Sequence, residues 1–255
     1  MNGNVSMLRP RAGNPATRPE LTDELRRAVE TRAADAREQL AAAVAEFGGE
    51  GEVTFANSFG AEDMVLTELI LRLGLPIEIF TLDTGRLPAE TYELMATVEK
   101  HFDARLKIYF PDTAAVEDYV RSEGINAFYE SVDLRKRCCQ IRKVEPLRRA
   151  LAGKKAWVTG LRAAQSTTRV GLPLRETDES HGLVKLNPLS AWSEQEVWGF
   201  IRIHDVPYSA LHDQFYPSIG CAPCTRAIAV GEDVRAGRWW WEDPTLKECG
   251  LHVKG

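Results

Sequence analysis

Five cysteines are the residues of this sequence best suited to chemistry. Four form two pairs, the adjacent Cys138-Cys139 and the C-x-x-C motif of Cys221 and Cys224, and the fifth, Cys249, lies six residues before the end of the chain. Four thiolates are the ligand set of a structural zinc ion or of an iron–sulfur cluster. The adjacent pair is unlike the paired C-x-x-C motifs of zinc sites, so the spacing favours iron–sulfur and leaves zinc as the alternative.

Cys249 is a candidate nucleophile, because a thiol near a chain end could enter a site, react and leave again. The alternative is an incidental exposed thiol. Residues 1–19 lack the apolar segment of a secretory signal. We expect a disordered tail there, with a transit peptide as the alternative. In a reducing compartment, metal binding or redox chemistry is the better expectation for an odd number of cysteines than disulfides.

Basic residues flank the adjacent cysteines in a chain whose net charge is −5. Arg135, Lys136 and Arg137 precede the pair, and Arg142 and Lys143 follow it. Positive charge at this position would stabilise thiolates and an anionic cluster. The alternative is a solvated charged surface.

The composition is that of a globular protein, with 44% hydrophobic and 27% charged residues. The acidic net charge argues against a general nucleic-acid or membrane-surface binder. No apolar run approaches the roughly 18–20 residues of a membrane span. The length permits one sizeable domain.

Strands and helices alternate through the first two thirds of the chain. We expect helices at 22–47, 61–73, 88–102 and 113–123, and strands at 53–58, 77–82, 106–110 and 156–159. This order predicts an α/β fold with a mostly parallel sheet and helices on both faces. A helix at 192–204, with Ser193 as its cap, ends the pattern. We expect an irregular C-terminal lobe beyond 207, with a separate domain as the alternative. The expected organisation is a tail at 1–20 and one domain at 21–255, whose end is mobile from about 240.

Three polar loops follow the strands, where parallel sheets bind ligands. In the first, Ser58 to Asp63, Gly60 would allow a sharp turn before a helix whose N-terminus suits phosphate. In the second, Leu82 to Arg86, a carboxylate could bind ribose hydroxyls or a base amine. The third, Gly160 to Arg169, combines two arginines with a glutamine and three hydroxyls, a composition suited to sulfate or phosphate oxygens. Ordinary turns and a solvated loop are the alternatives.

Together these segments resemble the assimilatory adenosine 5′-phosphosulfate (APS) reductases of bacteria, the iron–sulfur branch of the family that also contains the phosphoadenosine phosphosulfate (PAPS) reductases. The resemblance runs from about residue 55 to 252. The motifs that carry it are, in order, SFGAED, LDTG, KRCC-x-x-RKV-x-PL, GLRAAQS-x-TR, C-x-x-C, GRWWWE and ECGLH.

The resemblance implies an adenine nucleotide α-hydrolase-like fold of the ATP-pyrophosphatase type. The first loop is similar to the SGG-x-DS phosphate loop of that superfamily but differs at Phe59 and Glu62, which fits a reductase that does not split ATP. The resemblance also implies a 4Fe–4S cluster on Cys138, Cys139, Cys221 and Cys224. PAPS reductases without a cluster lack these cysteines, so APS is the expected substrate.

The implied mechanism is attack of the Cys249 thiolate on the sulfur of APS, followed by release of sulfite by thioredoxin or glutaredoxin. The residues expected to bind substrate are Ser58, Phe59, Gly60, Glu62, Asp63, Leu82, Asp83, Thr84, Gly85, Lys143, Gly160, Arg162, Gln165, Thr168, Arg169, Arg235, Arg238 and His252. A solvent-exposed role is the alternative for His252. Trp239 to Trp241 could pack the tail or contact the reductant. A cytoplasmic homo-oligomer is expected, with PAPS reduction, a zinc-containing nucleotide-binding sulfur-transfer protein and a redox sensor as alternative functions.

Overall fold

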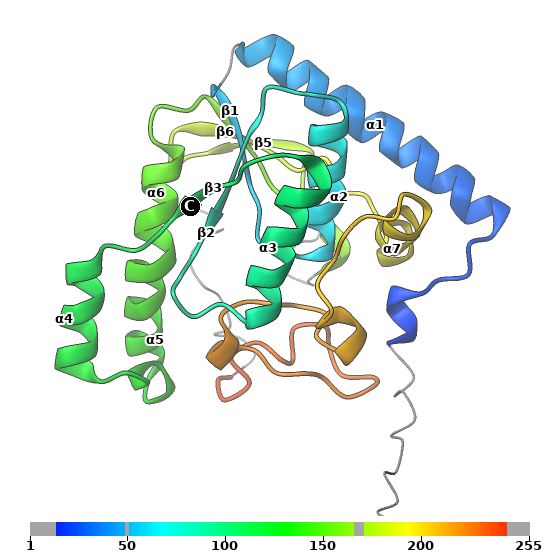
Figure 1. The fold of residues 1–255 in the computed structure, drawn as a ribbon. Helices are drawn as coiled ribbons and strands as arrows, with labels where there is room; N and C mark the ends of the chain where they lie inside the picture. Colours follow the sequence, from blue (N-terminus) through cyan, green and yellow to red (C-terminus); the bar gives the residue numbers. More distant parts are fainter. Residues whose placement is uncertain (1–13, 49–50, 166–170, 244–255) are drawn as a thin grey trace, which may run out of the picture.

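The computed structural model describes residues 14–48, 51–165 and 171–243, and within them a six-stranded sheet forms the centre of the molecule (Figure 1). Its strand order is β3-β2-β1-β4-β6-β5. The strands are β1 (Val53–Ala56), β2 (Glu78–Leu82), β3 (Lys107–Tyr109), β4 (Ala156–Val158), β5 (Arg175–Asp178) and β6 (Leu183–Leu186). All neighbours pair in parallel except β5, which is antiparallel to β6. The mostly parallel sheet expected from the sequence is confirmed.

Helices cover both faces of the sheet, as expected. On one face, α1 (Asp23–Phe47), α2 (Ala61–Arg72), α3 (Ala89–Phe102) and α7 (Glu194–Ile203) share a core with β1 and β4. On the other, α6 (Glu145–Leu151) packs on β2 and β3. There, Leu147 and Leu151 form a second core with Phe80 and Trp157. Helices α4 (Thr113–Glu123) and α5 (Val132–Cys139) lie beside α6 (Figure 1).

Helix ends follow the capping residues of the sequence. Helix α1 begins after Thr22, whose hydroxyl accepts the Leu25 N–H at 3.2 Å, and ends at Gly48 with φ of 80°. Helix α7 has the expected capping box, in which Ser193 and Glu196 exchange side-chain and backbone hydrogen bonds. These local signals explain why the boundaries of both helices could be placed from sequence.

Four regular elements, α5, α6, β5 and β6, were not predicted from the sequence. Helices α5 and α6, joined by a π-helical turn at Gln140–Val144, contain and follow the basic segment for which a solvated surface was the alternative interpretation. Strand β5 is a short polar edge strand, and β6, which lies between β4 and β5, has only four residues. Within the expected N-terminal tail, Pro15–Thr17 form a 3₁₀ turn and Thr17 is buried.

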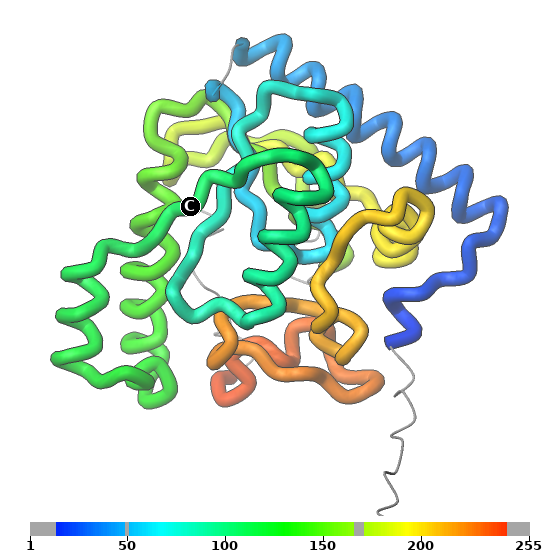
Figure 2. The backbone as a smooth tube through the Cα atoms, viewed as in Figure 1, coloured from blue at the N-terminus to red at the C-terminus, as the bar shows by residue number. Residues whose placement is uncertain are grey.

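The C-terminal lobe lies across the carboxyl ends of the strands (Figures 1 and 2). It is irregular, as expected, with 3₁₀ turns at His212–Gln214 and Ala222–Cys224. Trp239 is buried in the lobe, whereas Trp240 is exposed. No helix in the described part of the chain has the length and apolar character needed to cross a membrane.

Candidate functional site

A cavity of about 330 Å³ opens at the carboxyl ends of β1, β2 and β4 and is closed by the C-terminal lobe. Most residues expected to bind substrate line it: Ser58, Gly60, Glu62, Asp63, Leu82, Thr84, Lys143, Gly160, Arg162, Gln165, Arg235 and Arg238. Phe59, Asp83 and Gly85 do not line it. Thr168, Arg169, Cys249 and His252 lie outside the described residues.

The first loop turns at Phe59, not at Gly60 as the sequence suggested. Phe59 has φ of 61°, while Gly60 is extended with φ of −66°. The Phe59 N–H donates to the side-chain oxygen of Asn57 at 2.7 Å, and its ring is buried in the core. These contacts hold a side chain in the left-handed region that it would otherwise avoid. Phe59 therefore fixes the conformation of the loop from the core side, without lining the cavity.

Asp63 joins the first and third loops. The backbone N–H and the hydroxyl of Ser58 both donate to its carboxylate at 2.6 Å. On its other side lies Gly160, where a Cβ atom would be only 2.0 Å from the Asp63 carboxylate. Burial raises the pKa of Asp63 to about 6, against the hydrogen bonds from Ser58. Glycine is thus required at 160 by this close approach.

Arg162 is neutralised by Glu62 within the cavity. Its guanidinium contacts the Glu62 carboxylate at 2.7 and 2.8 Å and donates to the Trp192 carbonyl at 3.3 Å. Both side chains are largely buried. Glu62 therefore offsets the positive charge that the sequence predicted for Arg162. The positive charge of the cavity comes from Lys143, Arg235 and Arg238 on its other walls.

The second loop connects this cavity to the cysteines. Asp83 accepts hydrogen bonds from the Gly85 N–H at 2.7 Å and from the Tyr92 hydroxyl at 2.8 Å, so it stabilises the turn. Burial raises the pKa of Tyr92 to about 12, with Asp83 adding to the shift. The Thr84 hydroxyl lies 3.2 Å from the Cys221 sulfur.

All four cysteines of the expected metal centre line one small cavity of about 20 Å³. They are free thiols drawn from α5 and the C-terminal lobe. Four basic side chains line the same cavity: Arg86, Arg135, Arg142 and Lys143. Among the described residues, no group of histidine, cysteine or acidic side chains is placed to hold a metal ion. The shared cavity and the cations nevertheless give the four thiols the surroundings of an anionic centre.

Charge around these thiols is uneven. Burial works to raise the pKa of Cys221, but Lys143, the Thr84 hydroxyl and Arg238 outweigh it, and the pKa is lowered. The pKa of Cys224 is raised to about 12, first by burial and then by the charge of Cys221. The basic residues therefore lower the pKa of Cys221 below its ordinary value but do not do so for Cys224.

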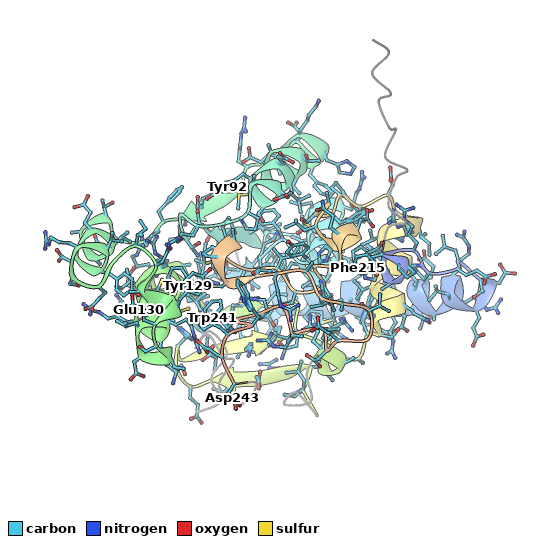
Figure 3. All side chains as sticks on the ribbon, turned by 90° about the horizontal axis from the view of Figure 1, so that it is seen from below. Tyr92, Tyr129, Glu130, Phe215, Trp241 and Asp243 are labelled. Carbon is cyan, nitrogen blue, oxygen red and sulfur yellow. The ribbon has the colours of Figure 1, made fainter. Side chains whose placement is uncertain are left out.

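Aromatic rings surround the cysteine cavity. Phe128 and Trp239 are buried against Cys224, and Trp241 packs with Tyr129 at 4.5 Å between ring centroids. Figure 3 shows Tyr129 and Trp241 side by side. The Tyr129 hydroxyl donates to the Pro223 carbonyl at 2.7 Å. This shell limits water around the thiols, which strengthens electrostatic interactions there.

Lys143 lines both cavities and follows the cysteine pair in the π-helical turn. Such turns occur often at functional sites. The sequence motifs predict a substrate-binding role for Lys143 but not for Arg142 or Arg86. Arg142 could have been found from spacing, because Arg135, Cys138, Cys139 and Arg142 follow the i, i+3, i+4, i+7 pattern of one helix face. Arg86 carries no comparable signal.

The fold is that of an α/β protein with a mostly parallel sheet and a cavity at the carboxyl ends of its strands. Yeast FAD synthetase in complex with FAD shares the fold, with a TM-score of 0.55, 14% identity, and coverage of 84% of this chain and 72% of that one. The model of the phosphoadenosine phosphosulfate reductase domain matches residues 52–227, and the chain belongs to that family.

Relatives in this family are similar over most of their length. The adenosine 5′-phosphosulfate reductase of Allochromatium vinosum is 66% identical over 200 residues, which is 78% of each chain. That of Burkholderia cepacia is 52% identical over 239 residues, covering 93% of this chain and 92% of its own. A PAPS reductase from Candida auris, solved as a phosphate complex, has a TM-score of 0.65 and 29% identity, covering 80% of this chain and 98% of that one.

Proposed function

We propose that this protein reduces adenosine 5′-phosphosulfate to sulfite and AMP in sulfate assimilation. The observation that carries the proposal is the position of Lys143, which lines both the cavity at the strand ends and the four-cysteine cavity. The names of the Allochromatium vinosum and Burkholderia cepacia relatives support the same substrate.

The large cavity suits an anionic nucleotide. A volume of about 330 Å³ lies within the usual range of ligand pockets. Apolar side chains, among them Phe80, Leu82 and Trp157, form one part of the wall. Lys143, Arg235 and Arg238 provide positive charge for phosphate and sulfate oxygens.

The four cysteines would hold a 4Fe–4S cluster. Their common cavity, the basic side chains around it and the aromatic shell support this assignment. When bound, the cluster would supply a fixed electrostatic centre beside Lys143, and the electrons would come from thiols. The alternative is a zinc ion on the same ligands.

Cys249 would attack the sulfur of APS as a thiolate. A bond forms between the Cys249 sulfur and the sulfate sulfur, the bond to the phosphate oxygen breaks, and AMP leaves with that electron pair. Lys143, Arg235 and Arg238 would neutralise the oxygens during this step. The product on the enzyme is an S-sulfocysteine.

A dithiol protein such as thioredoxin or glutaredoxin would complete the cycle. Its first thiolate attacks the Cys249 sulfur and releases sulfite, and its second thiol then resolves the mixed disulfide. The two electrons come from this dithiol, which becomes a disulfide. A cytoplasmic location and assembly into a homo-oligomer belong to the same proposal.

The replacement Cys249→Ser tests the proposal when sulfite release and iron content are measured together. We expect sulfite release to be lost while iron and acid-labile sulfide are retained. Activity in this variant, or a colourless protein with one zinc, would contradict the mechanism or the cofactor. Comparing APS with PAPS on the wild type decides the substrate, since faster turnover of the 3′-phosphorylated nucleotide would identify a PAPS reductase.

A further inference from the structure

His212 lies in the wall of the large cavity and has no role in the proposed sulfur chemistry. Its side chain is 2% exposed. Among the described residues, neither ring nitrogen has a partner that meets hydrogen-bond geometry, and the Tyr216 backbone, which influences the pKa of the ring, does not meet it either. Trp198, which also lines the cavity, holds the imidazole edge-on with 5.2 Å between ring centroids. A buried side chain without a partner in a cavity wall indicates that a ligand supplies the partner.

The imidazole is uncharged near neutral pH. Burial lowers the pKa of His212, and the opposing influences of Glu62, the Tyr216 backbone and Asp213 do not outweigh it. A neutral imidazole offers one N–H donor and one acceptor nitrogen. It is therefore suited to a group that can both donate and accept, such as a hydroxyl.

The N-terminal arm, residues 14–18, fixes the backbone around His212. The Asn14 side-chain amide donates to the His212 carbonyl, and the Asn14 N–H donates to the Asp213 carbonyl, both at 3.1 Å. The Thr17 hydroxyl donates to the Asp213 carboxylate at 2.6 Å. Asn14 itself lines the cavity. The arm thus forms part of the wall next to His212.

A second set of hydrogen bonds ties the arm and Asp213 to α7. The Tyr208 hydroxyl donates to the other carboxylate oxygen of Asp213 at 2.9 Å. Arg202 donates to the Tyr208 oxygen at 2.8 Å and to the Thr17 carbonyl at 2.9 Å. These bonds form a closed network, so the position of His212 depends on the arm being in place.

The charges of the cavity place the uncharged part of a nucleotide near His212. Lys143 lines the four-cysteine cavity as well as the large one, and the Arg238 guanidinium packs against Gly220, the residue before Cys221, which puts positive charge at the cysteine side. Glu62 lies close enough to His212 to influence its pKa, and it already neutralises Arg162. Phosphate and sulfate are therefore favoured at the cysteine side, and the sugar hydroxyls at the side of His212.

We propose that the His212 imidazole binds a sugar hydroxyl of the substrate nucleotide and that the N-terminal arm positions it through Asn14 and Thr17. The inference rests on the proposed function, because that function supplies the adenosine nucleotide. His212 is a binding residue in this account, and Asn14 and Thr17 are positioning residues.

The test compares AMP, 2′-deoxy-AMP and 3′-deoxy-AMP by calorimetry on the cluster-loaded full chain. We expect His212→Phe to weaken AMP binding about tenfold, as the loss of one hydrogen bond implies, and to raise the KM for APS similarly. Wild type should bind either 2′-deoxy-AMP or 3′-deoxy-AMP about tenfold more weakly than AMP. His212→Phe should bind that deoxy nucleotide and AMP with equal affinity. Thr17→Val should weaken AMP binding in the same hydroxyl-dependent way, by a smaller factor.

His204→Phe is the matched control, because this histidine packs on Phe200 beside Glu30 and does not line the cavity. It should leave AMP affinity unchanged. Equal weakening of all three nucleotides by His212→Phe, or no weakening, would overturn the inference; if that variant does not fold, the same comparison on Thr17→Val decides. A wild type that binds AMP but releases no sulfite from APS would instead refute the proposed function.

Discussion

Replacing Glu242 with glutamine would leave Arg135 as a buried charge without its counter-ion. The guanidinium of Arg135 contacts the Glu242 carboxylate at 2.9 and 2.6 Å, and the two side chains are 0% and 3% exposed. Arg135 also lies 4.8 Å from the ring centroid of Trp239 and beside Cys139. The pair therefore connects the cysteine helix to the C-terminal lobe.

Removing one partner of a buried ion pair typically costs about 3–5 kcal/mol. In a chain of this size, each kcal/mol lowers Tm by roughly 2–4 °C. We expect Glu242→Gln to lower Tm by roughly 6–20 °C, measured by circular dichroism on protein of equal iron content. The double replacement Arg135→Met with Glu242→Leu should recover most of the loss, because no buried charge remains.

The exposed pair of Arg175 and Glu46 provides the control. Its two contacts are 2.6 and 2.7 Å long, but the side chains are 48% and 49% exposed. Glu46→Gln should cost about 0–1 kcal/mol, because solvent screens such pairs. A cost below about 1 kcal/mol for Glu242→Gln as well would refute the reasoning, since burial would then not distinguish the two pairs.

Three further predictions concern single contacts. Gly160→Ala should abolish AMP binding measured by calorimetry, because its Cβ would meet the Asp63 carboxylate at 2.0 Å; Gly60→Ala, with contacts of 3.5 and 3.8 Å, should still fold, as its circular dichroism spectrum would show. The raised pKa of Asp63, about 6 against 3.8, means that the folded state holds this proton more tightly than the unfolded chain. Wild type should therefore lose about 2.4 kcal/mol of unfolding free energy relative to Asp63→Asn between pH 4 and pH 7, and parallel pH curves in urea titrations would contradict this. Ser193→Ala should cost about 1 kcal/mol by removing the capping box of α7, and an unchanged urea midpoint would argue against it.

The parts of the fold that could be predicted from sequence are those with strong local signals. Strand β2 is short and apolar, and α7 begins at a capping box, so both could be placed. Helix α5 could not, because its mean composition is polar and its buried face consists of Arg135 and Cys139. Burial of such residues depends on partners from the C-terminal lobe, which lie about 100 residues away in the chain. No pattern in the sequence of α5 indicates that contact.

The candidate site also combines features that could be predicted from the sequence with features that could not. The order of strands predicted that the three loops would meet, and they do. What each residue does within them could not be predicted, because it depends on neighbours from other loops. Arg162 meets Glu62 and becomes part of a neutral pair, while Asp83 binds Tyr92 and stabilises its own turn. The residue types alone therefore predict more charged side chains available to bind a ligand than the structure provides.

The four-cysteine cavity and the large cavity are joined through short covalent and hydrogen-bonded connections. Lys143 lies four residues after Cys139 in a π-helical turn, and Arg142 in the same turn donates to the Thr84 carbonyl at 2.6 Å. Thr84 in turn lies 3.2 Å from the Cys221 sulfur. A change in the positions of the four sulfurs must therefore move the cations and the second loop of the cavity. This coupling gives four cysteines a reason to lie beside a nucleotide site even though they carry no electrons in the proposed reaction.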